Sequence, residues 1–166
     1  MTATALLSRQ RVMASPLGPI QLTEEEGRLT RLSWGGEEHS RIDPGAESSA
    51  LLERAEAQLD EYFRGHRPAF DLPLAPRGTA FQQKVWDAMS RIPYGETWSY
   101  AALARRVDSV ARAVGQACGA NPIPIIIPCH RVLAENGALV GFSAVGGTES
   151  KSFLLELEGA RPLRLL

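Results

Sequence analysis

Cysteine and histidine are scarce in this sequence of 166 residues. The two cysteines are Cys118 and Cys129, the three histidines are His39, His66 and His130, and no CxxC or HxxxH spacing occurs. Two cysteines this close in sequence do not suggest a disulfide scaffold, and they fit a reducing compartment. A zinc site needs several such ligands at close spacing, so we expect no metal site.

Long apolar runs are also missing, which argues against a membrane protein and against a secreted one. No stretch approaches the roughly 18 consecutive apolar residues of a membrane span. Residues 1–10 lack the basic segment and the apolar core that mark a signal peptide. We therefore expect a cytoplasmic protein that makes no membrane contact.

The net charge of −1 argues against a protein that holds nucleic acid by charge alone. The charge is unevenly distributed, because residues 1–77 carry 9 basic and 12 acidic side chains, whereas residues 78–166 carry 9 and 7. A net positive second half is weak support for an anionic partner. Proline and glycine concentrate between Pro73 and Gly78, where the balance changes. We therefore predict two domains, residues 1–77 and residues 78–166.

The first half has the pattern of a small α/β domain. Apolar residues alternate between turn signals over residues 11–34, which predicts strands. Apolar residues at three- and four-residue spacing predict a helix over residues 47–64 that ends at Gly65. Phe70, Leu72 and Leu74 alternate and predict a short edge strand. None of these elements carries identifiable chemistry.

The second half begins with a series of predicted helices. Thr79 can cap a helix, and the apolar face that follows it consists of Phe81, Val85, Ala88, Met89 and Ile92. Ser99 can cap the next helix, which breaks at Asp108-Ser109. Another helix follows from Val110 to Gly119, so the pair is a helix-turn-helix candidate, although many such hairpins are only structural.

The second helix of this pair is rich in small residues. We expect its inner face to consist of Val110, Ala113, Val114 and Ala117. Its opposite face then carries Ala111, Arg112, Gly115, Gln116 and Gly119. Each helical glycine costs about 1 kcal/mol relative to alanine, which indicates that something approaches this backbone closely. One arginine among small residues suits insertion into a DNA groove, and the alternative is a poor helix packed against a neighbouring element.

The most informative stretch runs from Asn121 to Val132. Its isoleucines predict a buried strand that Pro128 ends, because proline cannot donate a ladder hydrogen bond. Cys129 follows at once, with His130 and Arg131 directly after it. Cations near a thiol favour the thiolate, which is the nucleophilic form. The alternative, a cysteine that is only a small buried hydrophobe, is weaker in the presence of these neighbours.

The last predicted helix covers residues 149–158. Glu158 falls within the arc of its apolar residues, whereas Glu156 falls outside it. A buried carboxylate needs a partner, and the candidates are His130 and Arg131; otherwise Glu158 reaches water at the helix end. Cys129, His130 and Glu158 would then be a nucleophile, its base and the group that orients the base.

Two chemistries remain open from these residues alone. One is a cysteine hydrolase or acyltransferase, which would need an oxyanion hole and a groove for a peptide. The other is a thiolate that takes an alkyl group from its substrate. The neighbouring helix-turn-helix candidate favours a nucleic-acid substrate and therefore the second chemistry.

Residues 78–159 resemble the active-site domain of the methylated-DNA–protein-cysteine methyltransferases, the O6-alkylguanine-DNA alkyltransferases of direct DNA repair. The segments that carry the resemblance are residues 78–86, 92–97, 99–100, 112–115 and 121–122 and the family's signature, Pro128-Cys129-His130-Arg131-Val132. Residues 1–77 match more loosely, in the order of their elements. The resemblance implies an α+β fold: a small ribonuclease H-like N-terminal α/β domain and a mostly helical C-terminal domain with a winged-helix-like helix-turn-helix.

The resemblance also implies an activity. The protein would repair DNA by irreversible, stoichiometric transfer of a methyl or alkyl group to Cys129 from O6-alkylguanine, with O4-alkylthymine as a secondary substrate, in a flipped-out nucleotide. The substrate is itself the alkyl donor, so no cofactor is expected. The expected partner is double-stranded DNA that contains alkylated bases, bound by a monomer that could assemble cooperatively on DNA. The alternative is a non-catalytic module that binds DNA lesions.

The family's functional residues carry over to this chain residue by residue. Cys129 would accept the alkyl group, His130 would take its proton through a water molecule, and Glu158 would complete the relay. Tyr100 would donate a proton to the departing guanine, and Asn121 would tie the helix-turn-helix to the active-site strand. The implied DNA-binding residues are Ser99, Arg112, Ala113, Gly115 and Gln116, with Arg112 filling the space that the flipped nucleotide leaves. The implied base-pocket residues are Pro124, Val132, Phe142 and Ser143.

Overall fold

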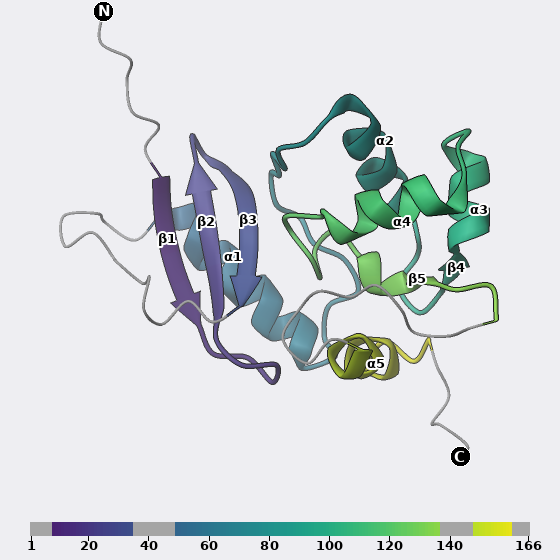
Figure 1. Ribbon diagram of the computed structural model, residues 1–166. Coiled ribbons are helices and arrows are strands. Elements are labelled where there is room, and N and C mark those ends of the chain that lie inside the picture. The colour runs from purple at the N-terminus through teal and green to yellow at the C-terminus, as the bar shows by residue number, and fades with distance from the viewer. Residues whose placement is uncertain (1–7, 35–48, 137–147, 161–166) are drawn as a thin grey trace, which may run out of the picture.

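A computed structural model describes residues 8–34, 49–136 and 148–160 of the chain. The N-terminal part is an antiparallel sheet in the order β1-β2-β3, formed by β1 (Ser8–Met13), β2 (Ile20–Glu25) and β3 (Arg28–Trp34). Helix α1 (Ala50–Phe63) lies across one face of this sheet (Figure 1). The predicted α/β character of the first half is therefore confirmed.

Helix α1 is delimited by two local signals. The Ser49 side chain accepts a hydrogen bond from the Leu52 backbone N–H at 3.2 Å, which satisfies one of the free donors of the first turn. At the other end Gly65 adopts a φ of +78°, a conformation that favours glycine. The apolar residues between them face the sheet and share one core with it, namely Leu52, Ala55, Leu59 and Tyr62.

The segment after α1 differs from the predicted edge strand of Phe70, Leu72 and Leu74. Among the described residues only Leu74 of these three pairs, through an isolated parallel bridge to Leu29. Two backbone hydrogen bonds hold this bridge, from Leu29 N–H to the Pro73 carbonyl and from Ala75 N–H to the Leu29 carbonyl. Prolines flank the bridge, and their missing N–H groups prevent a longer ladder.

The C-terminal part is mostly helical. Its elements are α2 (Ala80–Met89), β4 (Trp98–Ser99), α3 (Tyr100–Arg106), α4 (Ala111–Gly119), the 3-10 helix η2 (Cys129–Arg131), β5 (Val132–Leu133) and α5 (Thr148–Leu157). Thr79 caps α2 in a full capping box with Gln82. The two-residue strands β4 and β5 pair in parallel, which places the start of α3 beside the end of η2.

Trp86 ties α2 to α4. Its indole Nε1–H donates to the Ala117 carbonyl at 2.8 Å, and its side chain is only 2% exposed. The ring lies so close to Gly78 that a Cβ at that position would approach it to 2.3 Å. The apolar pattern predicts that Phe81 and Ala88 are core residues of α2, but both are only half-buried. Trp86, by contrast, is a buried residue of this helix.

Helices α3 and α4 form the predicted helix-turn-helix, with one correction. Asp108 adopts a φ of +58° in the turn between them, and α4 begins at Ala111. The prediction that Val110 lies on the inner face of α4 is wrong, because it precedes the helix as its N-cap and is 65% exposed. The inner face consists instead of Val114, Ala117 and Cys118.

The isoleucine-rich stretch is a tight loop and not the predicted strand. Between Asn121 and Pro128, all of which the structure describes, the only bridge joins Pro124 and Ile127. Ile125 has a φ of +75°, which a β-branched residue rarely adopts. Three of the isoleucines, Ile123, Ile125 and Ile127, are nearly fully buried. The burial of these isoleucine side chains in the core therefore stabilises the conformation of this loop.

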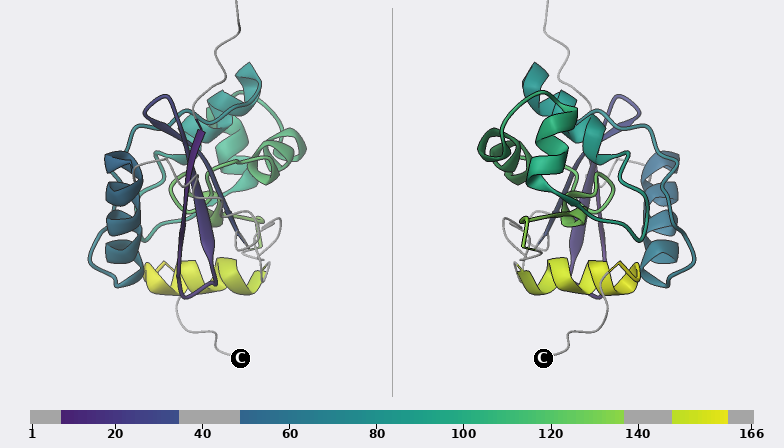
Figure 2. Two further views of the ribbon diagram at one scale, coloured as in Figure 1. Left: turned by 90° about the vertical axis from the view of Figure 1, so that its left-hand side faces the viewer. Right: turned by 90° about the vertical axis from the view of Figure 1, so that its right-hand side faces the viewer.

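Helix α5 lies along the lower edge of the molecule, between α1 and the helices of the C-terminal part (Figures 1 and 2). It packs on η2, and its Leu154 belongs to the core that joins both parts of the chain. The end of α5 is thereby brought next to the residues that follow Pro128. Within the described ranges, no helix is both long and apolar enough to cross a membrane.

Candidate active site

Cys129 is the first residue of η2 and is 8% exposed. Pro128 precedes it with a φ of −82°, and the Cys129 N–H donates to the Ile127 carbonyl at 2.8 Å. The rigid proline and this short hydrogen bond fix the direction in which the cysteine leaves the loop. The thiol is thus held at a defined place and is largely shielded from water.

Asn121 clamps the loop that carries Cys129. Its side-chain Nδ2 donates to the Ile127 carbonyl at 2.8 Å, and its Oδ1 accepts from the Ile123 N–H at 3.0 Å. Because Asn121 follows α4 closely, these bonds join the end of the helix-turn-helix to the Cys129 loop. This geometry is consistent with the linking role that the family resemblance implies for Asn121.

The electrostatic surroundings of Cys129 differ from those expected. Burial raises the pKa of the Cys129 thiol, while a hydrogen bond with Asn121 and the positive charge of Lys151 act to lower this pKa. The sequence predicts that the adjacent His130 and Arg131 supply the cation. That prediction is wrong, because both side chains bind Glu158 instead.

His130 and Glu158 form a fully buried pair. His130 Nε2 lies 2.7 Å from Glu158 Oε2, and both side chains have an exposed fraction of 0%. Burial lowers the pKa of His130, and the hydrogen bond with Glu158 offsets this only in part, so the imidazole is neutral at pH 7. A neutral imidazole that donates from Nε2 to the carboxylate keeps Nδ1 as a hydrogen-bond acceptor. His130 Nδ1 is buried and finds no hydrogen-bond partner within the described part of the chain.

Arg131 holds the other side of the same carboxylate. Its Nε donates to Glu158 Oε1 at 2.9 Å and its Nη2 donates to Oε2 at 3.0 Å, while Nη1 donates to the Ile92 carbonyl at 2.7 Å. Both predicted partners of Glu158 are therefore present at once. Burial alone would raise the pKa of Glu158, but hydrogen bonds from His130, Arg131 and Tyr62 outweigh burial and lower it to about 2. Glu158 is thus a permanent anion at neutral pH.

Tyr100 lies on the helix-turn-helix side of the thiol. It is the first residue of α3 and half-buried, and burial together with the nearby Cys118 and Cys129 thiols raises the pKa of its hydroxyl. Tyr100 therefore keeps its proton at neutral pH. Cys118 is 3% exposed, and burial raises its pKa to about 12, so it is a small core residue of α4.

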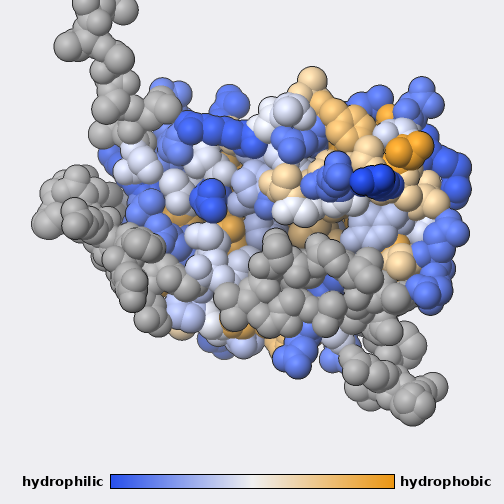
Figure 3. Space-filling model, viewed as in Figure 1, coloured by the Kyte–Doolittle hydropathy of each residue, from blue (hydrophilic) through white to orange (hydrophobic). Residues whose placement is uncertain are grey.

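The predicted DNA-binding residues gather around α4. Arg112 and Gln116 are both exposed on α4. Ser99 caps α3 by accepting a hydrogen bond from the Ala102 N–H at 3.0 Å. Gly115 is not purely an outer-face residue, because a Cβ there would lie 4.0 Å from the Tyr100 ring. The surface over α2 and α4 mixes hydrophobic residues with strongly hydrophilic ones (Figure 3).

The predicted base pocket is only partly within the described residues. Val132 is fully buried directly after η2, and Pro124 is half-buried in the Asn121–Pro128 loop. Pro124 thus precedes Cys129 in the chain, and Val132 follows it. Phe142 and Ser143 lie outside the described residues.

Two side chains of this site are not among the residues expected from the sequence. Lys151 is 1% exposed on α5, and its ammonium lies 5.7 Å from the centre of the Tyr100 ring. Its spacing to Leu154, Leu155 and Glu158 places it on the buried stripe of α5, and this spacing could have identified it. Tyr62 has no such signal, because on α1 it occupies an ordinary core position.

Replacing Lys151 with methionine should slow the reaction of Cys129 with iodoacetamide at neutral pH by about tenfold, because an opposite charge near a thiol favours the thiolate. Peptide mass spectrometry over a time course measures this rate. Lys84, the only other lysine, is exposed on α2 and supplies the control Lys84→Met, which should react like the natural chain. Equal rates for both variants would contradict the electrostatic role of Lys151.

Comparisons with known proteins agree in one family. Residues 80–160 match the family described as the DNA binding domain of 6-O-methylguanine DNA methyltransferase, and residues 9–76 match its ribonuclease-like domain. A constitutive methylated-DNA–protein-cysteine methyltransferase of Bacillus subtilis is 46% identical over 151 residues, which cover 87% of this chain and 91% of that protein. The Mycobacterium tuberculosis methyltransferase is 45% identical over 159 residues, which cover 91% and 92%.

Solved structures give the same result. A crystal structure of Mycobacterium tuberculosis OGT in complex with DNA has a TM-score of 0.79 and 45% identity, covering 92% of this chain and 93% of that one. A crystal structure of the Mycobacterium tuberculosis O6-methylguanine methyltransferase has a TM-score of 0.76 and 39% identity over 96% and 98%. With both of its parts matched by one family, the chain belongs to the methylated-DNA–protein-cysteine methyltransferases, which bind DNA and repair it directly by moving an alkyl group to a cysteine.

Proposed function

We propose that Cys129 is the alkyl acceptor of this chain and that its substrate is O6-alkylguanine in double-stranded DNA. The observation that carries this proposal is the buried His130–Glu158 pair, which leaves His130 Nδ1 as a proton acceptor next to Cys129 in the chain. A base that is already neutral at pH 7 can take the thiol proton, directly or through one water molecule. The anionic Glu158 then stabilises the imidazolium that forms.

These residues suffice for a balanced transfer step. The Cys129 sulfur attacks the alkyl carbon, a sulfur–carbon bond forms, and the bond between this carbon and guanine O6 breaks. The electron pair of the broken bond passes to the purine, which takes a proton from the Tyr100 hydroxyl. Proton transfer from His130 back to Tyr100 through the solvent completes the balance, so that the thiol proton ends on guanine. The raised pKa of Tyr100 keeps its hydroxyl protonated at neutral pH, so the proton is in place when the purine leaves.

The product is a thioether, which has no ready leaving path, so each protein molecule should act once. Mixing a limiting amount of protein with an excess of O6-methylguanine duplex tests this. Lesion loss should stop at one lesion per protein molecule. Continued turnover would instead indicate a hydrolytic enzyme, and the absence of any lesion loss with normal DNA binding would indicate a module that only binds lesions.

The alkylated base must leave the helix stack to reach a thiol that is 8% exposed. The exposed Arg112 on α4 is the long side chain that can occupy the space left in the stack, next to small residues that permit close approach. Guanine is the proposed base, and O4-alkylthymine is a secondary substrate. The protein would act as a monomer in solution that can assemble cooperatively on DNA. A reactive thiol that must stay reduced supports a cytoplasmic location.

Replacing Arg112 with alanine should slow methyl transfer from duplex DNA by about tenfold to a hundredfold, because the opened stack costs a few kcal/mol without a side chain to fill it. Transfer from O6-methylguanine in a single strand should change little. Rapid-quench measurements on both substrates separate the two effects. Arg64, which is exposed at the end of α1 and pairs with Asp60, supplies the control Arg64→Ala. Equal losses on both substrates would contradict the role in base flipping.

We also propose that the chain consists of two domains with a boundary between residues 77 and 78. The segment between Pro73 and Gly78 joins the sheet side of the molecule to α2. Limited proteolysis there should cut the chain into two fragments that a denaturing gel resolves, if the two parts behave as domains.

A further inference from the structure

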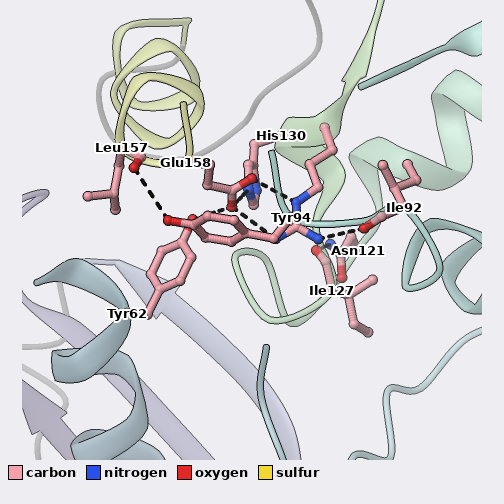
Figure 4. Close-up of polar contacts among 9 residues, drawn as sticks. Tyr62, Ile92, Tyr94, Asn121, Ile127, His130, Leu157 and Glu158 are labelled. Atoms are coloured by element: carbon pink, nitrogen blue, oxygen red, sulfur yellow. Dashed lines mark hydrogen bonds and ion pairs between the residues drawn. The ribbon is translucent and has the colours of Figure 1, made fainter. Parts of the chain in front are cut away.

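Tyr62 links the N-terminal part of the chain to the proposed proton relay. It lies on α1, is 0% exposed, and donates its hydroxyl proton to Glu158 Oε2 at 2.6 Å across a separation of 96 residues. Figure 4 shows its ring rising from α1 toward the carboxylate, on the side opposite the Ile92 carbonyl that Arg131 binds. The relay therefore includes a group from outside the C-terminal part.

The hydroxyl of Tyr62 shares its acceptor atom with the proposed base. Glu158 Oε2 receives Tyr62 at 2.6 Å, His130 at 2.7 Å and Arg131 at 3.0 Å, while Oε1 receives only Arg131 among the described residues. A carboxylate oxygen that serves three donors divides its negative charge among them. Each added donor lowers the attraction that remains for a proton on His130.

The position of this hydroxyl is fixed by aromatic packing. The Tyr62 ring centre lies 5.5 Å from Phe63, 5.3 Å from Phe70 and 6.3 Å from Tyr94, with edge-to-face or tilted geometry. Aromatic rings in such contacts have few alternative orientations. A merely structural hydroxyl also needs a partner when buried, but this one is aimed at the charged group of the relay.

We propose that Tyr62 is a positioning residue that sets the orientation and basicity of His130 through Glu158, so that the ribonuclease-like part of the chain controls the chemistry of Cys129. This inference rests on the proposed alkyl transfer. The residue does not touch the substrate. It acts on the carboxylate of the relay, and its contribution is a hydrogen bond that a phenylalanine of the same shape lacks.

The other charged or titratable groups around the pair belong to three elements. Arg131 on η2 and Lys151 on α5 both act to lower the pKa of His130, and Glu158 acts to raise it. Tyr94, in the loop after α2, also faces Glu158, and its hydroxyl lies 3.4 Å from the Leu157 carbonyl. All of these groups remain in place when only the Tyr62 hydroxyl is removed. A change in the His130 titration can therefore be assigned to that hydroxyl.

The test is the pH profile of methyl transfer in the full-length Tyr62→Phe variant. Single-turnover rates are measured with O6-methylguanine duplex, and the titration of His130 is followed by nitrogen-15 NMR of its imidazole. Without the third donor, Glu158 should hold a proton on His130 more strongly, so the acid limb of the rate profile should move to higher pH. We expect a rate about fivefold lower near pH 6 and less than about twofold lower near pH 8.5.

Tyr94→Phe is the matched control, because it removes a neighbouring tyrosine hydroxyl that bonds a backbone carbonyl and not the carboxylate. Its profile should coincide with that of the natural chain. The inference is overturned if the Tyr62→Phe profile and the His130 titration both coincide with those of the natural chain. A natural chain that transfers no methyl group would instead overturn the proposed function, and the NMR titration would still decide whether Tyr62 acts on His130.

Discussion

Replacing Glu158 with glutamine should lower the free energy of unfolding at neutral pH by about 3–5 kcal/mol, the usual cost of removing one member of a buried ion pair. Glutamine has nearly the same shape but carries no charge. It leaves the Arg131 guanidinium, which is 8% exposed, without its bidentate partner. The glutamine amide nitrogen is a hydrogen-bond donor, and it would face the donor groups of Tyr62, His130 or Arg131 that the carboxylate oxygen accepts from.

The same substitution should flatten the acid unfolding curve. The Glu158 pKa is about 2 in the folded chain and about 4.3 in an unfolded one. At a pH above about 4.3, its ionisation therefore contributes on the order of 3 kcal/mol to the free energy of unfolding. This contribution is lost as the pH falls from about 4.3 to about 2. The lowered pKa of His130 acts in the same direction, because the unfolded chain takes up a proton on this histidine first, below about pH 6.5.

Urea unfolding at neutral and acid pH, followed by tryptophan fluorescence, measures both effects. Glu156→Gln is the matched control, because Glu156 is exposed in the last turn of α5, two residues before Glu158. It should change the free energy of unfolding by less than about 0.5 kcal/mol. If Glu158→Gln were no more destabilising than this control, the buried pair would not have the importance that its geometry indicates.

Replacing Cys129 with serine should abolish methyl transfer, with a rate at least about a thousandfold lower, because the serine hydroxyl is not ionised and is a poor nucleophile. The two side chains differ by one atom, so the loop held by Asn121 and Pro128 should keep its shape. Binding to an alkylated duplex should therefore stay within about twofold of the natural chain. Gel-shift binding and single-turnover transfer on one protein preparation measure the two quantities together.

Cys118→Ala is the control for this substitution. Cys118 lies 3.4 Å from the Met89 sulfur within the core, and its raised pKa of about 12 keeps it a neutral thiol. We expect full stoichiometric transfer with this variant and a modest loss of stability. Normal transfer by Cys129→Ser, or lost transfer by Cys118→Ala, would contradict the assignment of Cys129 as acceptor.

The parts of the site that follow from helical spacing and local motifs could be predicted from the sequence. The spacing rule separates the buried Glu158 from the exposed Glu156, and Thr79 and Ser99 cap the predicted helices. The pairing of Glu158 with His130 and Arg131 follows from the rule that a buried carboxylate needs donors. Family resemblance then implies roles that no spacing alone provides.

Other features depend on contacts between distant segments and could not be predicted in this way. Tyr62 has the spacing of a core aromatic, and its hydroxyl partner lies 96 residues away. That the charge of Lys151, and not that of the adjacent Arg131, acts on the Cys129 thiol depends on how α5 packs on η2. The Asn121–Pro128 loop resembles a strand in sequence because apolar composition indicates burial but not backbone conformation, and Ile125 with its positive φ is the clearest case.

The most direct test of the assignment of Cys129 as alkyl acceptor is the mass of the protein after reaction with O6-methylguanine duplex, followed by peptide mapping. We expect that every active molecule gains the mass of one methyl group, that this group sits on the peptide of Cys129, and that the peptide of Cys118 stays unmodified. An unmodified Cys129 in a protein that binds the duplex normally, or a methyl group found on another residue, would contradict the assignment.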